Sequence, residues 1–89
     1  MNIHILYFAS LRERLGTGAE QLALPAGVRS VAELRQWLAA RGGVWAEAFT
    51  PPASGRDRLR AAVDQAMATA DTPLHDGAEV AFFPPVTGG

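Results

Sequence analysis

Residues 73–89, with the sequence PLHDGAEVAFFPPVTGG, decide the fold because they combine a turn, an apolar strand and a Pro-Pro pair that stiffens the chain after the strand. Asp76-Gly77 is a strong turn signal, and residues 79–83 after it have the composition of a strand. Pro84-Pro85 ends that strand and favours an extended chain beyond it. The two phenylalanines of the strand are adjacent, so they are expected to point to opposite faces of the sheet, one of them outward.

The sequence ends in Gly88-Gly89. Glycine carries no side chain, so this end could enter a channel too narrow for other residues. Residues 84–89 would reach roughly 20 Å when extended. A frayed chain end is the alternative, because chain ends are often disordered. The strand and the prolines favour an extended functional tail over residues 84–89.

A free α-carboxylate suggests a chemistry for such a tail. It is ionised at neutral pH, with a reference pKa of about 3.3–3.7, and is a poor electrophile. Adenylation would convert Gly89 into a mixed anhydride, after which a sulfur donor could leave a thiocarboxylate or an amine could take the acyl group. In either case the chain is a carrier, and the catalytic groups lie on other proteins.

The composition fits one small globular domain spanning residues 1–89. Of the 89 residues, 48% are hydrophobic and 19% charged, which is enough apolar mass for one core. A net charge of −1 gives no general attraction to nucleic acid or to anionic lipid, so neither is an expected partner. No apolar run is long enough for a membrane span, and a cytoplasmic location is expected. Cysteine and lysine are absent, which excludes disulfides and lysine Schiff bases.

The rest of the chain predicts an alternation of short strands and helices. Capping-box spacings at Ser10/Glu13 and at Ser30/Glu33 each indicate a helix start. Proline and glycine in residues 50–55 indicate a surface loop. Residues 59–70 carry a helical stripe rich in alanine, so propensity alone favours a helix there. The predicted elements are strands at 2–9 and 20–24, a short helix at 11–15, the main helix from Ser30, and a helical turn at 44–49.

Other polar residues give weaker signals. His4 and His75 stand far apart without a companion ligand pattern, so a structural or surface role is expected and no metal site is predicted. Arg56, Arg58 and Arg60 alternate at strand spacing. They could form a cationic edge for an acidic partner, although a solvated edge strand protected by charge is the simpler interpretation.

The segment at 73–89 closely resembles the C-terminus of the small subunit of molybdopterin synthase, the MoaD family. Leu6-Tyr7-Phe8-Ala9, Val31-Ala32-Glu33-Leu34-Arg35 and Ala61-Ala62-Val63-Asp64-Gln65 extend the resemblance over the whole chain. It implies an α+β, ubiquitin-like β-grasp fold, with a mixed sheet wrapped around one main helix and a flexible C-terminal Gly-Gly tail. It also implies that residues 59–70 form two strands joined by a turn near Asp64-Gln65, against the local helical signal.

The same resemblance implies a mechanism. An adenylyltransferase of the ubiquitin-activating type would use ATP to adenylate Gly89, and a sulfur donor protein would convert Gly89 into a thiocarboxylate. The tail would then enter the large subunit of a heterotetrameric synthase and donate sulfur to cyclic pyranopterin monophosphate, forming the molybdopterin dithiolene. The active site is expected on that large subunit, and no permanently bound cofactor is expected. The residues implied at the partner or at the reacting end are Phe8, Met67, Phe83, Pro84, Pro85, Val86, Thr87, Gly88 and Gly89.

Three other functions stay open. The chain could carry sulfur for thiamine or for tRNA thiolation, although the sequence of residues 82–86, which leads up to Gly88-Gly89, argues against this. It could be a ubiquitin-like modifier whose Gly89 is joined to lysines of target proteins. It could also be a structural interaction domain, for which Gly88 and Gly89 would be dispensable.

Overall fold

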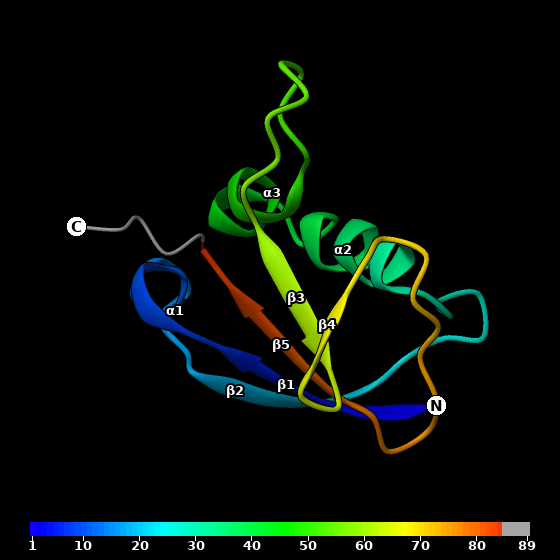
Figure 1. The fold of residues 1–89 in the computed structure, drawn as a ribbon. Helices are drawn as coiled ribbons and strands as arrows, with labels where there is room; N and C mark the ends of the chain where they lie inside the picture. The colour runs from blue at the N-terminus through cyan, green and yellow to red at the C-terminus, as the bar shows by residue number, and fades with distance from the viewer. Residues whose placement is uncertain (85–89) are drawn as a thin grey trace.

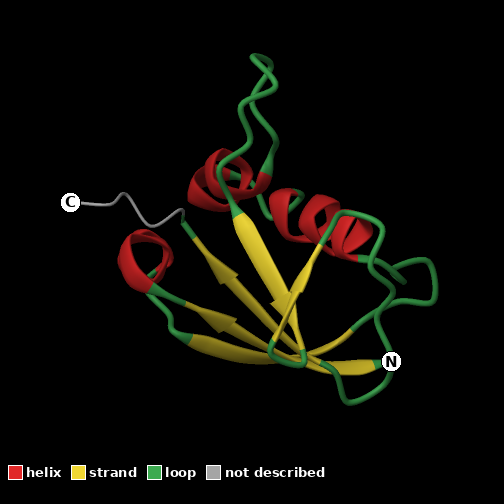
Figure 2. Ribbon diagram, viewed as in Figure 1, coloured by secondary structure: helices red, strands yellow, loops and turns green. Residues whose placement is uncertain are grey.

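The computed structural model describes residues 1–84, which form a curved five-stranded sheet with three helices (Figures 1 and 2). The elements follow one another as β1 (Asn2–Tyr7), α1 (Ala9–Leu15), β2 (Ala19–Ala23), α2 (Val31–Ala39), α3 (Gly43–Phe49), β3 (Arg60–Val63), β4 (Ala66–Ala68) and β5 (Glu79–Phe83).

The sheet has the strand order β2-β1-β5-β3-β4. The pairing of β1 with β5 is parallel, and the other three pairings are antiparallel, so the sheet is mixed. α2 and α3 cover its concave side, while α1 lies at the end of the sheet where β5 finishes (Figure 1). This arrangement is the β-grasp that the resemblance implied.

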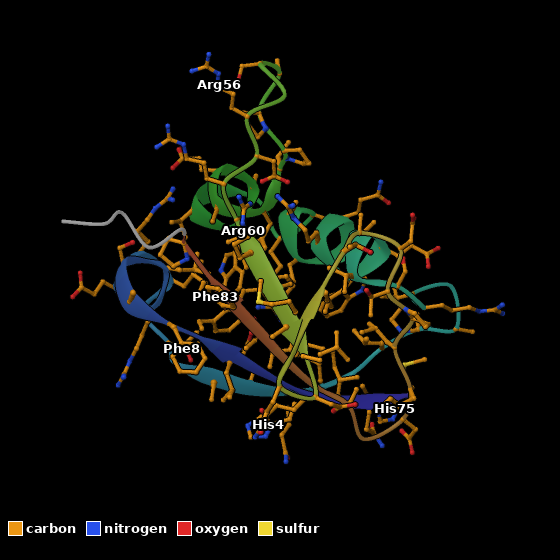
Figure 3. The ribbon with its side chains drawn as sticks, in the orientation of Figure 1. His4, Phe8, Arg56, Arg60, His75 and Phe83 are labelled. Carbon is orange, nitrogen blue, oxygen red and sulfur yellow. The ribbon has the colours of Figure 1, made fainter. Side chains whose placement is uncertain are left out.

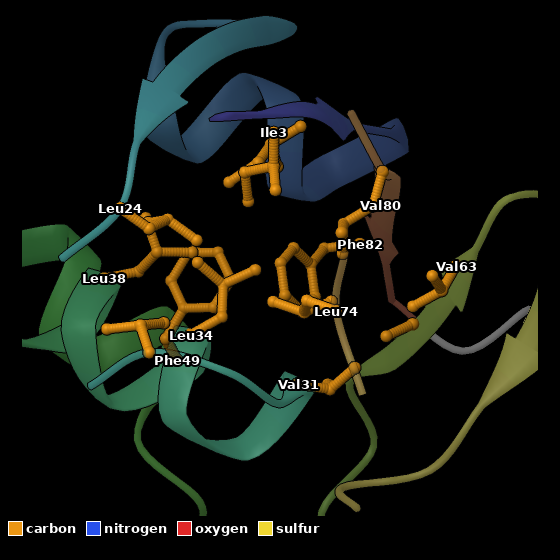
Figure 4. Packing of buried hydrophobic residues seen from close by; sticks show 14 of the residues in the cluster. Ile3, Leu24, Val31, Leu34, Leu38, Phe49, Val63, Leu74, Val80 and Phe82 are labelled. Carbon is orange, nitrogen blue, oxygen red and sulfur yellow. The ribbon is translucent and has the colours of Figure 1, made fainter. Parts of the chain in front are cut away.

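The core lies between the sheet and α2 because both contribute an apolar stripe. Every second residue of β1 and β5 is buried, and α2 places Val31, Leu34 and Leu38 against them (Figure 4). Phe49 of α3 and Phe82 of β5 are both fully buried, and their rings meet edge to face with centroids 5.1 Å apart. This pair joins the helical layer to the central strand.

The predicted start of the main helix is confirmed in detail. The Ser30 hydroxyl accepts a hydrogen bond from the Glu33 backbone N–H (3.2 Å), and the Glu33 carboxylate accepts one from the Arg29 N–H (3.0 Å). The first bond satisfies a backbone donor that the first turn of a helix leaves free, and the second holds the residue just before the N-cap. The capping box therefore fixes where α2 begins.

The capping box predicted at Ser10 is wrong. The Phe8 N–H still donates to the Phe82 carbonyl oxygen (3.1 Å), so pairing with β5 continues to Phe8. Ala9 then adopts a left-handed backbone conformation (φ 54°), and α1 begins at Ala9 with no side-chain cap. Ser10 consequently lies inside the first turn, and β1 ends at Tyr7 rather than at Ala9.

Residues 59–70 form strands, as the resemblance implied and local propensity did not. β3 and β4 pair antiparallel, and the turn between them consists of Asp64 and Gln65. Both residues have positive φ (50° and 70°), the backbone that a tight two-residue hairpin requires. The loop at 50–55 is exposed throughout, as expected.

Candidate functional site

The outer side of the sheet carries a group of apolar side chains that face away from the core. We call it the outer apolar face and define it by Leu6, Phe8, Ala62, Met67, Ala81 and Phe83. Strand register brings these residues together: Leu6 pairs with Ala81, Ala81 with Ala62, and Ala62 with Met67. The face therefore crosses four neighbouring strands.

Phe8 and Phe83 lie at the end of this face (Figure 3). Tyr7 pairs with Phe82 across β1 and β5, so the next residues along both parallel strands, Phe8 and Phe83, are neighbours. Phe8 is 47% exposed and Met67 68% exposed. Large apolar side chains exposed together on one sheet are typical of a surface that another protein covers.

The two phenylalanines of β5 have opposite environments, as the alternation of a strand predicts. Phe82 is fully buried, whereas Phe83 is half-buried on the outer side. Pro84 follows, also half-buried, and lies beside a hollow lined by Arg14, Ala48, Arg58 and Leu59, among others. The predicted site residues Pro85, Val86, Thr87, Gly88 and Gly89 lie outside the described residues.

Arginines gather near this end of the sheet. Arg60 pairs with Phe83 in the β3–β5 register. Arg56, Arg58 and Arg60 are all exposed and alternate with less exposed residues, as their spacing predicts. The expected edge strand is wrong, because Arg56 and Arg58 lie in the loop before β3 and β3 itself lies between β5 and β4. Asp57 turns inward between the arginines and forms an ion pair with Arg35. A hydrogen bond from Arg35 holds the pKa of Asp57 below its ordinary value of 3.8.

The opposite end of the sheet is acidic and holds a pair that the sequence did not reveal. His75 Nε2 lies 2.6 Å from Asp64 Oδ2, and the other Asp64 oxygen accepts from the Glu79 N–H (3.0 Å). The bond from the Glu79 N–H and then the bond with His75 lower the pKa of Asp64, while Asp64 raises the pKa of His75. The pair ties the β3–β4 turn to the approach to β5, which gives His75 a structural role. The two residues are 11 positions apart in the chain, and no local pattern links them.

A second cluster missed from the sequence joins β1, β2 and the helices. The Tyr7 hydroxyl donates to Glu20 Oε2 (2.7 Å), and Glu20 also pairs with Arg41 (3.0 Å). The Arg41 guanidinium lies over the rings of Trp37 and Trp45, 5.3 and 4.4 Å from their centroids. Burial, and then the bond to Glu20, raises the pKa of Tyr7 far above its ordinary value, so the phenol stays protonated. The cluster braces the fold away from the outer apolar face.

The described residues contain an exposed apolar surface that is suited to binding. Across residues 1–84, no three histidine, aspartate or glutamate side chains come together in a way that could hold a metal ion. Within the same range, no helix is long and apolar enough to cross a membrane. The outer apolar face, the arginines beside it and Pro84 are together the candidate site.

Fold and site together define a β-grasp protein with an apolar binding face where its last strand ends. The model of the ThiS family matches residues 5–89, and the chain belongs to that family. It is similar to the molybdopterin synthase sulfur carrier subunit of Escherichia coli K12, with 47% identity over 98% of this chain and 99% of that protein.

Two solved structures show the same fold. SAMP1 of Haloferax volcanii superposes with a TM-score of 0.79 at 23% identity, with both chains fully covered. In the complex of subunits 1 and 2 of the molybdopterin-converting factor from Helicobacter pylori, the matching chain gives a TM-score of 0.63 at 19% identity, again with full coverage of both. At these identities the likeness establishes the fold alone.

Proposed function

We propose that this chain is the sulfur carrier subunit of molybdopterin synthase. The observation that carries the proposal is the 47% identity, over nearly the full length of both chains, to a protein of that name. The outer apolar face adds physical support, because a carrier without a catalytic centre must act by docking on other proteins. Phe8, Met67 and Phe83 are the residues through which it would dock.

The proposed chemistry takes place at Gly89. On an activating adenylyltransferase, its carboxylate would attack the α-phosphate of ATP and release pyrophosphate. A sulfur donor protein would then displace AMP and leave a thiocarboxylate, in which sulfur replaces one carboxylate oxygen. Two such carriers in turn would give their sulfur to cyclic pyranopterin monophosphate, and each Gly89 would return as a carboxylate. We place this cycle in the cytoplasm.

The amino-acid composition suits a chain with an activated end. The sequence contains no lysine whose ε-amine could attack its own acyl-adenylate, and no cysteine that could exchange with a sulfur donor. The chain thus lacks the lysine amine and the cysteine thiol, the side chains most reactive toward the intermediates that Gly89 would form.

The proposed assembly is a heterotetramer of two large and two small subunits. The outer apolar face would cover part of the large subunit, and residues 84–89 would enter that subunit's active site. The complex of subunits 1 and 2 in Helicobacter pylori shows that a chain of this fold does pair with a second subunit.

The experiment that tests the proposal is the intact mass of the N-terminally tagged chain, purified from its own cells and again after incubation with ATP, the activating enzyme and a sulfur source. A mass increase equal to one oxygen-to-sulfur exchange, located at Gly89 by fragmentation, is expected. A plain carboxylate under every condition would refute the carrier role. Gly89 in isopeptide linkage to another protein would instead identify a protein modifier.

The pathway is tested separately by adding the thiocarboxylate form to the large subunit and cyclic pyranopterin monophosphate. Molybdopterin should form in an amount limited by the carrier. A carrier that receives sulfur and yet forms no molybdopterin would belong to another thiolation pathway.

A further inference from the structure

The loop between α3 and β3 stands away from the body of the protein (Figure 1). We call residues 50–60, which comprise this loop and the first residue of β3, the arginine loop. Its base is held by one guanidinium: Arg35 Nε donates to the Phe49 carbonyl oxygen (3.2 Å), and Arg35 Nη1 and Nη2 donate to the two carboxylate oxygens of Asp57. Asp57 also accepts from the Leu59 N–H (3.2 Å). Both ends of the loop are thereby tied to α2.

The same ion pair leaves the loop positively charged. The charge of Asp57 is balanced by Arg35, whose side chain is only 13% exposed. Among residues 1–84, no carboxylate lies within 4.0 Å of the guanidinium of Arg56, Arg58 or Arg60. Arg60 instead donates to the backbone carbonyl oxygen of Asp57 (3.0 Å). The loop therefore presents three arginines without an acidic partner.

These arginines follow a line from the tip of the loop to the end of β5. Arg56 lies at the tip, and Arg60 lies at the sheet beside Phe83 (Figure 3). Arg58 lines the hollow next to Pro84. Two features of the molecule thus converge where the chain leaves β5: the outer apolar face on one side and the arginine loop on the other.

The arginines form a local positive patch in a protein whose net charge is −1. Asp64, Asp76 and Glu79 lie at the opposite end of the sheet, whereas Glu47 lies near the patch and pairs with Arg14. A local patch of one sign can orient a protein in the field of an oppositely charged partner before contact.

We propose that the arginine loop is a docking element that binds a carboxylate-rich surface bordering the channel into which residues 84–89 are inserted. Guanidinium groups pair with carboxylates through two parallel hydrogen bonds, which fix direction as well as charge. The loop would align the carrier, and the outer apolar face would then close on the partner. This inference rests on the proposed function, since it assumes a protein that receives the tail.

The test uses the full chain and the molybdopterin synthase large subunit of the same organism, with association and dissociation followed at low and at high salt. The variant is R56E/R58E, and its component R56E is compared with R29E. Arg29 is also exposed but lies at the start of α2, away from β5, and its reversal changes the net charge equally. A urea titration of each variant checks that the fold is retained.

We expect R56E/R58E to lower the association rate about tenfold at low salt, with a much smaller effect at high salt and little change in dissociation. R56E should also lower the association rate at low salt, and by more than R29E does. An unchanged association rate for R56E/R58E, or equal effects of R56E and R29E, would overturn the docking role of the loop alone. Failure of the unaltered chain to bind the large subunit would overturn the proposed function and this inference together.

A polyanion control identifies the other class of partner. A single-stranded RNA oligonucleotide, used as the probe at physiological salt, should not bind the chain. Binding that is lost in R56E/R58E would assign the loop to nucleic acid and overturn the proposal.

Discussion

Phe82 and Phe83 allow a direct test of which face of β5 stabilises the fold and which face binds a partner, because the two residues are adjacent, chemically identical and on opposite faces of the strand. Phe82 is fully buried against Phe49, and Phe83 is half-buried on the outer apolar face. Truncating each to alanine should therefore affect stability and binding in opposite proportions. Phe82→Ala should act on stability, and Phe83→Ala on binding.

The expected magnitudes follow from burial. Removing a fully buried phenylalanine ring costs about 3–5 kcal/mol, through lost transfer energy and the cavity that remains. A small domain is stable by about 5–15 kcal/mol, so Phe82→Ala should leave a marginal fold. Phe83 keeps part of its side chain exposed on the outer apolar face, so we expect Phe83→Ala to cost clearly less than Phe82→Ala, about 1–2 kcal/mol.

Binding should show the reverse order of effect. An aromatic side chain that anchors an interface contributes about 2 kcal/mol or more, and Phe83 lies where the outer apolar face meets the proposed tail, so Phe83→Ala should weaken the complex with the large subunit roughly thirtyfold. Equilibrium urea denaturation gives the stabilities, and titration calorimetry with the large subunit gives the affinities. Phe82→Ala that still folds should bind with nearly unaltered affinity.

Two results would refute this reasoning. Equal losses of stability in the two variants would mean that β5 does not separate core from binding face as described. Unchanged affinity of Phe83→Ala would mean that the large subunit, if it binds, uses a surface other than the outer apolar face.

Three further predictions concern the ion pairs and the chain end. Asp57→Asn should lower the free energy of unfolding by about 1 kcal/mol at neutral pH, because Arg35 loses its charged acceptor. The pKa of Asp57 is lowered from 3.8, so the stabilising contribution of its carboxylate is lost as the pH falls. Urea denaturation well below pH 3.8 should therefore show no difference in stability between this variant and the unaltered chain. His75→Ala should remove stability in a defined pH window: the raised pKa of His75 means that its contribution is lost as the pH rises beyond 6.5, and the lowered pKa of Asp64 means that the pair persists down to below pH 3.8. Identical profiles of stability against pH for the two proteins would contradict the pair. Deleting Gly89 should abolish molybdopterin formation and leave the melting temperature unchanged, and a lowered melting temperature would show that this residue contributes to the fold.

Much of the fold was predictable because local signals and tertiary packing agree over most of the chain. The Ser30 capping box and the turn before β5 each depend on only four or five consecutive residues, so the sequence predicts them directly. They fail where long-range pairing overrides them. Ser10 had the spacing of a cap, but β5 extends the ladder to Phe8 and moves the helix start to Ala9.

The stretch at 59–70 is the clearest case of such an override. Its alanines favour a helix, yet they pair as β3 and β4 because Asp64 and Gln65 accept the left-handed backbone of a tight turn, and β5 supplies a neighbour for β3. The family resemblance supplied this assignment, and residue propensity did not. Alanine fits either structure, so its context decides.

The candidate site was predictable where it depends on alternation and hidden where it depends on distant partners. An outward phenylalanine next to a buried one follows from strand geometry. The inward turn of Asp57 toward Arg35 and the bond between Asp64 and His75 join residues 22 and 11 positions apart in the chain. Spacing in the sequence does not reveal such contacts, because the partners are brought together only by the fold.

The strand that leads to Pro84 lies inside the sheet, with β1 on one side and β3 on the other. A partner that draws the chain end into a channel pulls along the axis of β5, in the plane of the sheet. In that direction the hydrogen bonds to both neighbours are loaded together in shear, whereas an edge strand pulled sideways would lose its bonds one after another. If the proposed carrier cycle holds, the tension of each insertion would be borne by the middle of the sheet and shared between β1 and β3.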